Sequence, residues 1–330
     1  MKPSLVKALF SLRKPLDLLL CVAIIPAAWL MRSYRRFGSE RLPATTRRLK
    51  AMGVFPISNH YYEPLFDERL LTAPLDEDRA LPGIDLDLAG QEALLDSMHC
   101  ADELLALKLN EPPADPLRFS LNNGSFESGD AEFLYQFLRH TQPRKVIEIG
   151  SGNSTKIAQM ALQQNRKAAE AAGRATPSTE HICVEPYEQP WLEKLGNIQV
   201  LRARVEVCGI DWATALEPGD LLFIDSSHVI RPQGDVLKEY LEILPLLKPG
   251  VFVHVHDIFT PKDYPRAWVV DVVRLWNEQY LLEALLGNSA RYKVVAAMNH
   301  LKHKRFDKLQ KVCPYLTADR EPGSFYLQIR

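Results

Sequence analysis

The fold is decided by residues 145–155, KVIEIGSGNST. An apolar run predicts a buried strand at 145–150, and the glycines then lead directly into a helix expected at 155–173. Gly150 and Gly152 lack side chains, so the backbone can turn tightly there and approach a ligand closely. Thr155 stands where a dinucleotide-binding fingerprint has its third glycine, and the lysine of a triphosphate-binding loop is absent too. The stretch therefore predicts a strand, a ligand-contacting loop and a helix.

Working outward, strands and helices alternate through residues 122–330. Strands are predicted at 145–150, 181–186, 198–205, 220–227, 251–258, 292–298 and 324–329, and helices at 128–140, 155–173, 188–195, 235–247 and 267–286. This alternation is typical of an α/β fold with a doubly wound, mostly parallel sheet, whose ligands lie beyond the carboxyl ends of the strands. No helix is predicted between the last two strands, so we expect them to form an antiparallel hairpin at the sheet edge.

Composition narrows the class of protein. The chain has 330 residues, 46% of them hydrophobic and 25% charged, which excludes a disordered, collagen-like or multi-spanning membrane protein. The five cysteines are scattered without a CxxC pair, which indicates reduced thiols in a cytosolic setting. We expect three regions: a basic segment at 1–50, an N-terminal cap region at 51–121 containing a helix at 90–107, and the α/β domain at 122–330.

The near-neutral total charge hides a basic head on an acidic body. Residues 1–50 contain eleven bases and two acids, so this segment carries +9 and the remainder −10. Residues 18–31 are uncharged, which is shorter than the roughly 20 residues of a membrane-spanning helix, and Pro26 is expected to bend them. A signal peptide is disfavoured because arginines follow Met31 instead of a cleavage site.

Three interpretations of this head remain open: an interfacial helix, a single span, and a core helix of a soluble protein. Apolar burial together with basic side chains near anionic lipid favours membrane association through residues 1–36, with the interfacial mode slightly preferred. The body is then expected to face the cytosol. Nucleic-acid binding is disfavoured because the bases surround an apolar helix and not an aromatic groove.

Two acids lie at predicted strand ends near the glycine loop. Glu148 stands two residues before Gly150, where a carboxylate can meet a cationic ligand. Glu185 ends the second strand and suits hydrogen bonds to ribose hydroxyls, although it follows the glycines by more than the usual spacing. The alternative for Glu185 is a solvated loop acid.

A second group of polar residues ends the fourth and fifth strands, in IDSSH (224–228) and HVHDIF (254–259). Asp225 and Asp257 are expected to lie near each other, and with His256 they suit an oxygen-rich site for Mg²⁺ or Mn²⁺. His228 can act as a general base toward a substrate hydroxyl. One of the two histidines 254 and 256 is alternatively a packed core residue, because strand alternation places both on one face.

These motifs together carry a family resemblance. EIGSGNST (148–155), VEP (184–186), LLFIDSSH (221–228), LLKPG (246–250) and HD (256–257) resemble, in order and spacing, the class I S-adenosylmethionine-dependent methyltransferases. The likeness covers about residues 122–330. Within that superfamily it is similar to the branch of macrocin-type O-methyltransferases and cephalosporin-hydroxylase-like proteins.

The resemblance implies roles for particular residues. The cofactor would be bound by Gly150, Ser151, Gly152, Asn153 and Glu185, with Glu148 nearby. Asp225 and Asp257 would bind the divalent metal, and His228 would take the proton. His256 stands where the family pattern has the first acid of a pair, so the resemblance does not carry over to the affinity or the identity of the metal.

The implied reaction is methyl transfer to a hydroxyl of a saccharide or another small or lipid-linked acceptor. Two alternatives stay open: a nicotinamide-dependent oxidoreductase, which the missing third glycine disfavours, and a non-catalytic scaffold of the same fold at a membrane surface. NHYYEP (59–64) is expected either to line the substrate or to pack as a cap. The acceptor and the oligomeric state are not readable from the sequence.

Overall fold

The computed structural model describes residues 3–176 and 178–330, with the backbone alone for residues 3–12. The chain forms two compact units, Met1–Thr72 and Ala73–Arg330. The division falls between the boundaries expected at 50 and 121. Residues 73–121 therefore belong to the same unit as the α/β domain, which their packing below explains.

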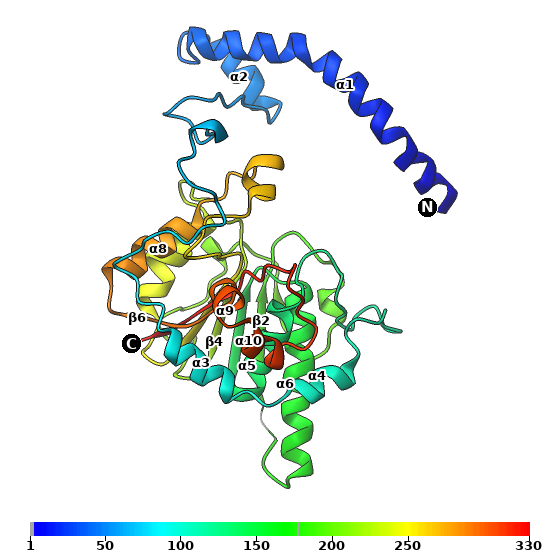
Figure 1. Ribbon diagram of the computed structural model, residues 1–330, viewed down its shortest axis with the longest axis vertical. Coiled ribbons are helices and arrows are strands. Elements are labelled where there is room, and N and C mark those ends of the chain that lie inside the picture. The colour runs from blue at the N-terminus through cyan, green and yellow to red at the C-terminus, as the bar shows by residue number, and fades with distance from the viewer. Residues whose placement is uncertain (1–2, 177) are drawn as a thin grey trace. The chain divides into compact units, whose positions relative to one another are not determined.

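The first unit is dominated by one long helix, α1 (Pro3–Phe37), followed by α2 (Pro43–Ala51) and the short turn η1 (Glu68–Leu70). Figure 1 shows α1 as a continuous, bent ribbon, and it runs through both Pro15 and Pro26. Side chains 13–30 are all exposed to solvent. The part Arg13–Phe37, 25 residues long, has the length and apolar composition of a membrane-crossing helix. The 14 uncharged residues 18–31 therefore make up only part of this apolar helix.

Residues after α1 fold back onto its end. The hydroxyl groups of Tyr34 and Thr46 lie 2.6 Å apart, and Arg35 pairs with Glu63. NHYYEP lies in this unit, where Tyr61 and Tyr62 pack ring on ring and are both 81% exposed. Apart from this mutual stacking, the two rings are exposed to solvent in the described part of the chain.

The second unit is built on a seven-stranded sheet. Its strands are β1 (Lys145–Ile149), β2 (Glu180–Val184), β3 (Gln199–Leu201), β4 (Leu221–Ile224), β5 (Phe252–Val255), β6 (Tyr292–Ala297) and β7 (Phe325–Ile329), in the order β3-β2-β1-β4-β5-β7-β6. Strands β1 to β5 are parallel, and β7 lies antiparallel between β5 and β6. The predicted doubly wound, mostly parallel sheet is confirmed.

Helices cover both faces of the sheet, so strand residues are buried whichever way they point (Figure 1). One face packs Val146, Leu221 and Phe223 against α5 (Asp130–Thr141) and α6 (Asn153–Ala171). Leu104 of α4 (Ala101–Leu107) and Phe119 join the same core, which is why residues 73–121 fold with the sheet.

The opposite face is covered by two other stretches. Its strand residues, such as Leu222 and Ile224, pack against side chains of residues 236–247 and of α8 (Glu278–Asn288). The first stretch comprises α7 (Asp235–Lys238), η4 (Glu239–Ile243) and η5 (Leu244–Leu246). The remaining short turns are η2 (Leu192–Lys194), η3 (Val205–Val207) and η6 (Ala267–Asp271).

Three helix predictions are wrong in detail. The helix expected at 90–107 is two helices, α3 (Leu88–Asp96) and α4 (Ala101–Leu107), and only η2 forms within 188–195. The helix expected at 267–286 is interrupted after η6, because four valines crowd the segment and Val273 takes a left-handed φ of 59°.

The connection between the last two strands also differs from the expectation. β6 and β7 are antiparallel neighbours, but α9 (Met298–Lys304) and α10 (Phe306–Val312) lie between them. Each helix buries only two apolar side chains, Met298 and Leu301 in α9 and Leu309 and Val312 in α10. A pattern with so few core residues gives too weak a periodicity to predict a helix.

Candidate active site

The glycine loop lies directly against the end of the neighbouring strand β4. Gly150 has φ +79°, and its N–H donates to the Val184 carbonyl at 3.0 Å. A Cβ atom at this position would overlap the backbone carbonyl of Asp225. Gly150 is therefore required both by its backbone conformation and by the close approach of two strand ends.

Glu185 is fixed at the next strand end by backbone donors. Its carboxylate accepts hydrogen bonds from the N–H groups of Ser151 (3.2 Å), Tyr187 (2.9 Å) and Glu188 (2.9 Å). It is 8% exposed and lines the cavity described next, so it is a rigid acceptor and not a solvated loop acid. The Ser151 hydroxyl is buried without a hydrogen-bond partner among the described residues.

A cavity of about 1250 Å³ lies at the carboxyl ends of β1, β2 and β4. Its wall contains the predicted cofactor residues Gly150, Ser151, Gly152, Asn153 and Glu185, together with Asp225. The Asn153 amide donates to Asn123 Oδ1 (3.0 Å) and Ser125 Oγ (2.9 Å), which ties the 123–126 segment to the cavity wall. The structure thus brings five of the six predicted cofactor residues to one cavity.

Glu148 lies elsewhere. It is fully buried, its Oε2 accepts a hydrogen bond from Thr155, and its Oε1 lies 3.2 Å from His181 Nε2. Burial disfavours the imidazolium, but the Glu148 carboxylate outweighs burial and raises the pKa of His181 to about 10. Gly152 N–H in turn donates to Thr155 Oγ1 at 3.1 Å. Glu148 therefore supports the loop from beneath and does not line the cavity.

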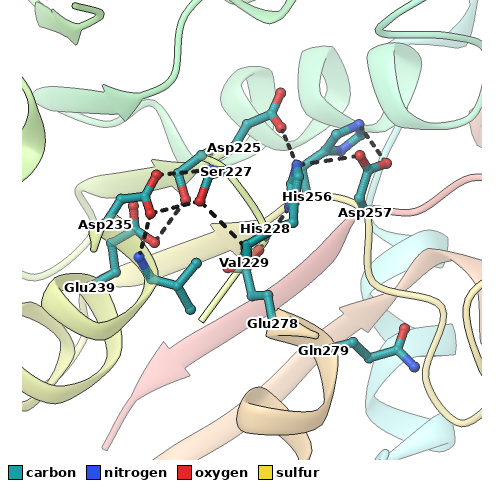
Figure 2. Close-up of polar contacts among 12 residues, drawn as sticks. Asp225, Ser227, His228, Val229, Asp235, Glu239, His256, Asp257, Glu278 and Gln279 are labelled. Atoms are coloured by element: carbon teal, nitrogen blue, oxygen red, sulfur yellow. Dashed lines mark hydrogen bonds and ion pairs between the residues drawn. The ribbon is translucent and has the colours of Figure 1, made fainter. Parts of the chain in front are cut away.

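His228 forms the centre of a second polar group, shown in Figure 2. Its Nδ1 lies 2.8 Å from Glu278 Oε2, and its Nε2 lies 3.3 Å from Asp225 Oδ1 and 3.5 Å from Asp257 Oδ2. Ligand atoms of Asp225, His228 and Asp257 all lie within 4.8 Å of one another. Because Glu278 holds one ring nitrogen, the other faces the two aspartates.

The backbone at the strand ends produces this convergence. β4 stops at Ile224 and β5 at Val255, and both His228 and Asp257 then adopt a left-handed φ of 59°. This conformation is uncommon for residues other than glycine and is retained mainly where a site requires it. It lets Asp257 leave the strand alternation and turn toward Asp225.

The charged side chains of this group shift one another's pKa values. Burial favours the neutral form of Asp225, but the charges of His256 and His228 outweigh burial and hold the pKa of Asp225 below its usual value. Burial alone would lower the pKa of His228, yet Asp225 and Glu278 raise it well above its ordinary value. The excess of negative charge around His228 suits a cation.

The two histidines of HVHDIF have different surroundings. His254 is fully buried among Phe223 and Tyr326, and burial holds its pKa well below the ordinary value. His256 Nε2 lies 3.5 Å from Asp257 Oδ1, while its ring packs on Phe126. His256 therefore lies beside the Asp225–His228–Asp257 group without joining it.

Sequence reasoning missed Glu278 and Trp276. Glu278 begins α8 and is fully buried, and the Trp276 ring lies 4.2 Å from the His228 ring. The unbroken helix predicted at 267–286 placed both residues inside a helix, where nothing distinguished them. An asparagine before the glutamate, Asn277, was the available signal, because it favours a helix start.

Comparison with known proteins agrees with this geometry. Residues 147–258 match the family model described as a methyltransferase domain. No curated protein is significantly similar in sequence.

Two solved O-methyltransferase structures are distantly similar to this chain. The O-methyltransferase from Bacillus cereus in complex with SAH is 14% identical, with 73% of this chain and 91% of that chain covered and a TM-score of 0.36. The O-methyltransferase TomG from Streptomyces achromogenes, in complex with SAM, is 16% identical, with 72% and 89% covered and a TM-score of 0.36. On the family match, residues 147–258 are similar to a methyltransferase domain.

Proposed function

We propose that the chain is an S-adenosylmethionine-dependent O-methyltransferase that uses His228 as its general base. The observation that carries the proposal is the orientation of His228: Glu278 holds Nδ1, and Nε2 faces Asp225 at the rim of the cavity. A base held this way presents its second ring nitrogen, Nε2, in one fixed direction.

The cavity residues suit the cofactor. When bound, S-adenosylmethionine supplies a methyl group on a positively charged sulfur. Glu185 would accept hydrogen bonds from ribose hydroxyls, and the unpartnered Ser151 hydroxyl would find a partner there. Because Gly150 and Gly152 have no side chains, a ligand would be able to approach the loop backbone closely.

The reacting hydroxyl would lie near His228 Nε2, which accepts its proton, and Glu278 would stabilise the resulting imidazolium. The carboxylates of Asp225 and Asp257 are oxygen donors that fit Mg²⁺ or Mn²⁺, and they leave His228 Nε2 to act as the base. Asp225 and Asp257 would hold such an ion, which would supply Lewis-acid polarisation of the acceptor oxygen.

Calorimetry of the purified chain with S-adenosylmethionine tests this proposal. We expect saturable binding, and no binding of NADH. Asp257→Asn is expected to retain cofactor binding, to weaken Mn²⁺ binding measured by electron paramagnetic resonance by about 10–100-fold, and to lower turnover. Asp96→Asn, on a surface ion pair with Lys308, is the matched control.

The outcomes separate the two parts of the proposal. A wild-type chain that does not bind the cofactor would overturn the main proposal. Turnover that is unchanged in EDTA, with the cofactor bound, would overturn the metal assignment alone.

We further propose that α1 places the enzyme on a membrane and that the acceptor hydroxyl belongs to a saccharide or lipid-linked molecule. Leu19 and Ile25 are exposed on α1, and each lysine placed in a lipid-buried helix costs about 2.5–3.5 kcal/mol. Full-length Leu19→Lys/Ile25→Lys should therefore leave the carbonate-washed membrane pellet, whereas wild type stays. Leu70→Lys, an equally exposed position outside α1, should behave as wild type. A double variant that still pellets would show that α1 is not the anchor.

A further inference from the structure

An arginine lies between two tryptophans next to the proposed base. The guanidinium carbon of Arg274 is 4.5 Å from the ring centroid of Trp268 and 4.4 Å from that of Trp276. Trp276 also contacts His228, with ring centroids 4.2 Å apart. One indole ring thus separates Arg274 from the residue that would accept the proton.

Arg274 has no carboxylate partner among the described residues. Two other half-buried arginines of this unit do pair with carboxylates: Arg79 with Glu283 and Asp263, and Arg139 with Glu103. Stacking between indoles occupies the two faces of a guanidinium and leaves the N–H donors on its edge available. The stack also fixes the direction of those donors before any ligand arrives.

The surroundings of Arg274 make an unpaired cation unusual. The nearby site is acidic, with Asp225, Asp257 and Glu278 around His228. Arg274 follows Val273, whose left-handed backbone is unfavourable for a β-branched residue. Such a conformation persists where the surrounding structure imposes it, and here it presents Arg274 between the indoles.

The position of Arg274 indicates contact with the methyl acceptor and not with the cofactor. The wall of the 1250 Å³ cavity includes Asp225 but none of Trp268, Arg274 and Trp276. A ligand group at Arg274 would therefore reach His228 from outside the proposed cofactor cavity. The planar donor edge of arginine matches the paired oxygens of a phosphate or carboxylate.

We propose that Arg274 binds an anionic group, a phosphate or a carboxylate, of the methyl acceptor. This inference rests on the proposed function, because it assigns the charge class of the substrate of the same site. Trp268 and Trp276 position Arg274, and Trp276 also fixes its place relative to His228.

The test follows the indole N–H resonances of the full chain, ¹⁵N-labelled at tryptophan, in a neutral maltoside detergent at low salt. The five signals are assigned with single Trp→Phe variants. Methyl phosphate, dimethyl phosphate and acetate are titrated separately, and methanol is the uncharged control. The diester represents a lipid-type phosphate and the monoester a free phosphate, so the arms distinguish these sources.

We expect at least one anion to shift the Trp268 and Trp276 signals saturably, and Arg274→Gln to weaken that binding by tenfold or more. Arg274→Lys keeps the charge but not the planar edge, so it should bind between the two. Arg174→Gln, an exposed arginine elsewhere on the unit, should match wild type. Shifts equal in wild type and Arg274→Gln, or no anion-specific shift of these two signals in wild type, would overturn the inference.

Cofactor binding is measured on the same samples by calorimetry. A chain that binds S-adenosylmethionine without the anion-dependent shifts would refute the anionic acceptor alone. A chain that shows the shifts but no cofactor binding would refute the proposed function and leave the anion site standing.

Discussion

His228→Ala is expected to lower turnover by about 10²–10⁴-fold, the usual contribution of a general base, while cofactor affinity stays near the wild-type value. The reason is spatial: His228 does not line the cavity, whereas Asp225 lies between the cavity and the His228 ring. Single-turnover kinetics with saturating cofactor measures the effect on chemistry separately from binding.

Two further variants are compared with His228→Ala. Glu278→Gln keeps an acceptor for His228 Nδ1 but removes the charge that stabilises the imidazolium, so we expect a smaller loss than for His228→Ala. His140→Ala removes an exposed histidine at the end of α5 and should leave turnover unchanged. Turnover in His228→Ala equal to that of wild type would remove His228 as the base.

The sequence could predict the strand ends because parallel strands bring their carboxyl ends to one edge. Asp225 and Asp257 are 32 positions apart, yet each follows a buried run, and the structure places both within reach of His228. The same reasoning placed Glu185 at the cavity. The positions of these residues depend only on strand order, which the alternation of strands and helices predicts.

Other parts of the site depend on packing that no local pattern reveals. Glu148 lies in a strand buried on both faces, so alternation could not show that its carboxylate would meet His181 beneath the loop. Glu278 reaches His228 only because the segment after η6 breaks its helix, and that break depends on the backbone of Val273. The side chain of Arg274 is held between two indole rings, Trp268 and Trp276, which are eight residues apart in the sequence.

Alanine at either loop glycine should weaken cofactor binding, but only Gly150→Ala should also destabilise the fold, and this contrast separates folding from ligand binding. In Gly150→Ala the new Cβ would overlap the Asp225 backbone, and the left-handed φ adds about 1–2 kcal/mol of strain. We expect the free energy of unfolding to fall by about 2–4 kcal/mol and cofactor binding to be lost as Asp225 moves. Thermal unfolding followed by circular dichroism measures the first effect, and calorimetry the second.

In Gly152→Ala, by contrast, the nearest contact of the added Cβ is the Gln189 side chain at 3.8 Å, an ordinary van der Waals distance. Stability should stay within about 0.5 kcal/mol of wild type, whereas the methyl group enters the cavity wall and should weaken cofactor binding. Gly196→Ala, with open space around the position, should change neither quantity. If Gly150→Ala unfolded at the wild-type temperature, the close approach of the loop to β4 would be wrong. If Gly152→Ala bound the cofactor as wild type does, the ligand would not pass over that part of the loop.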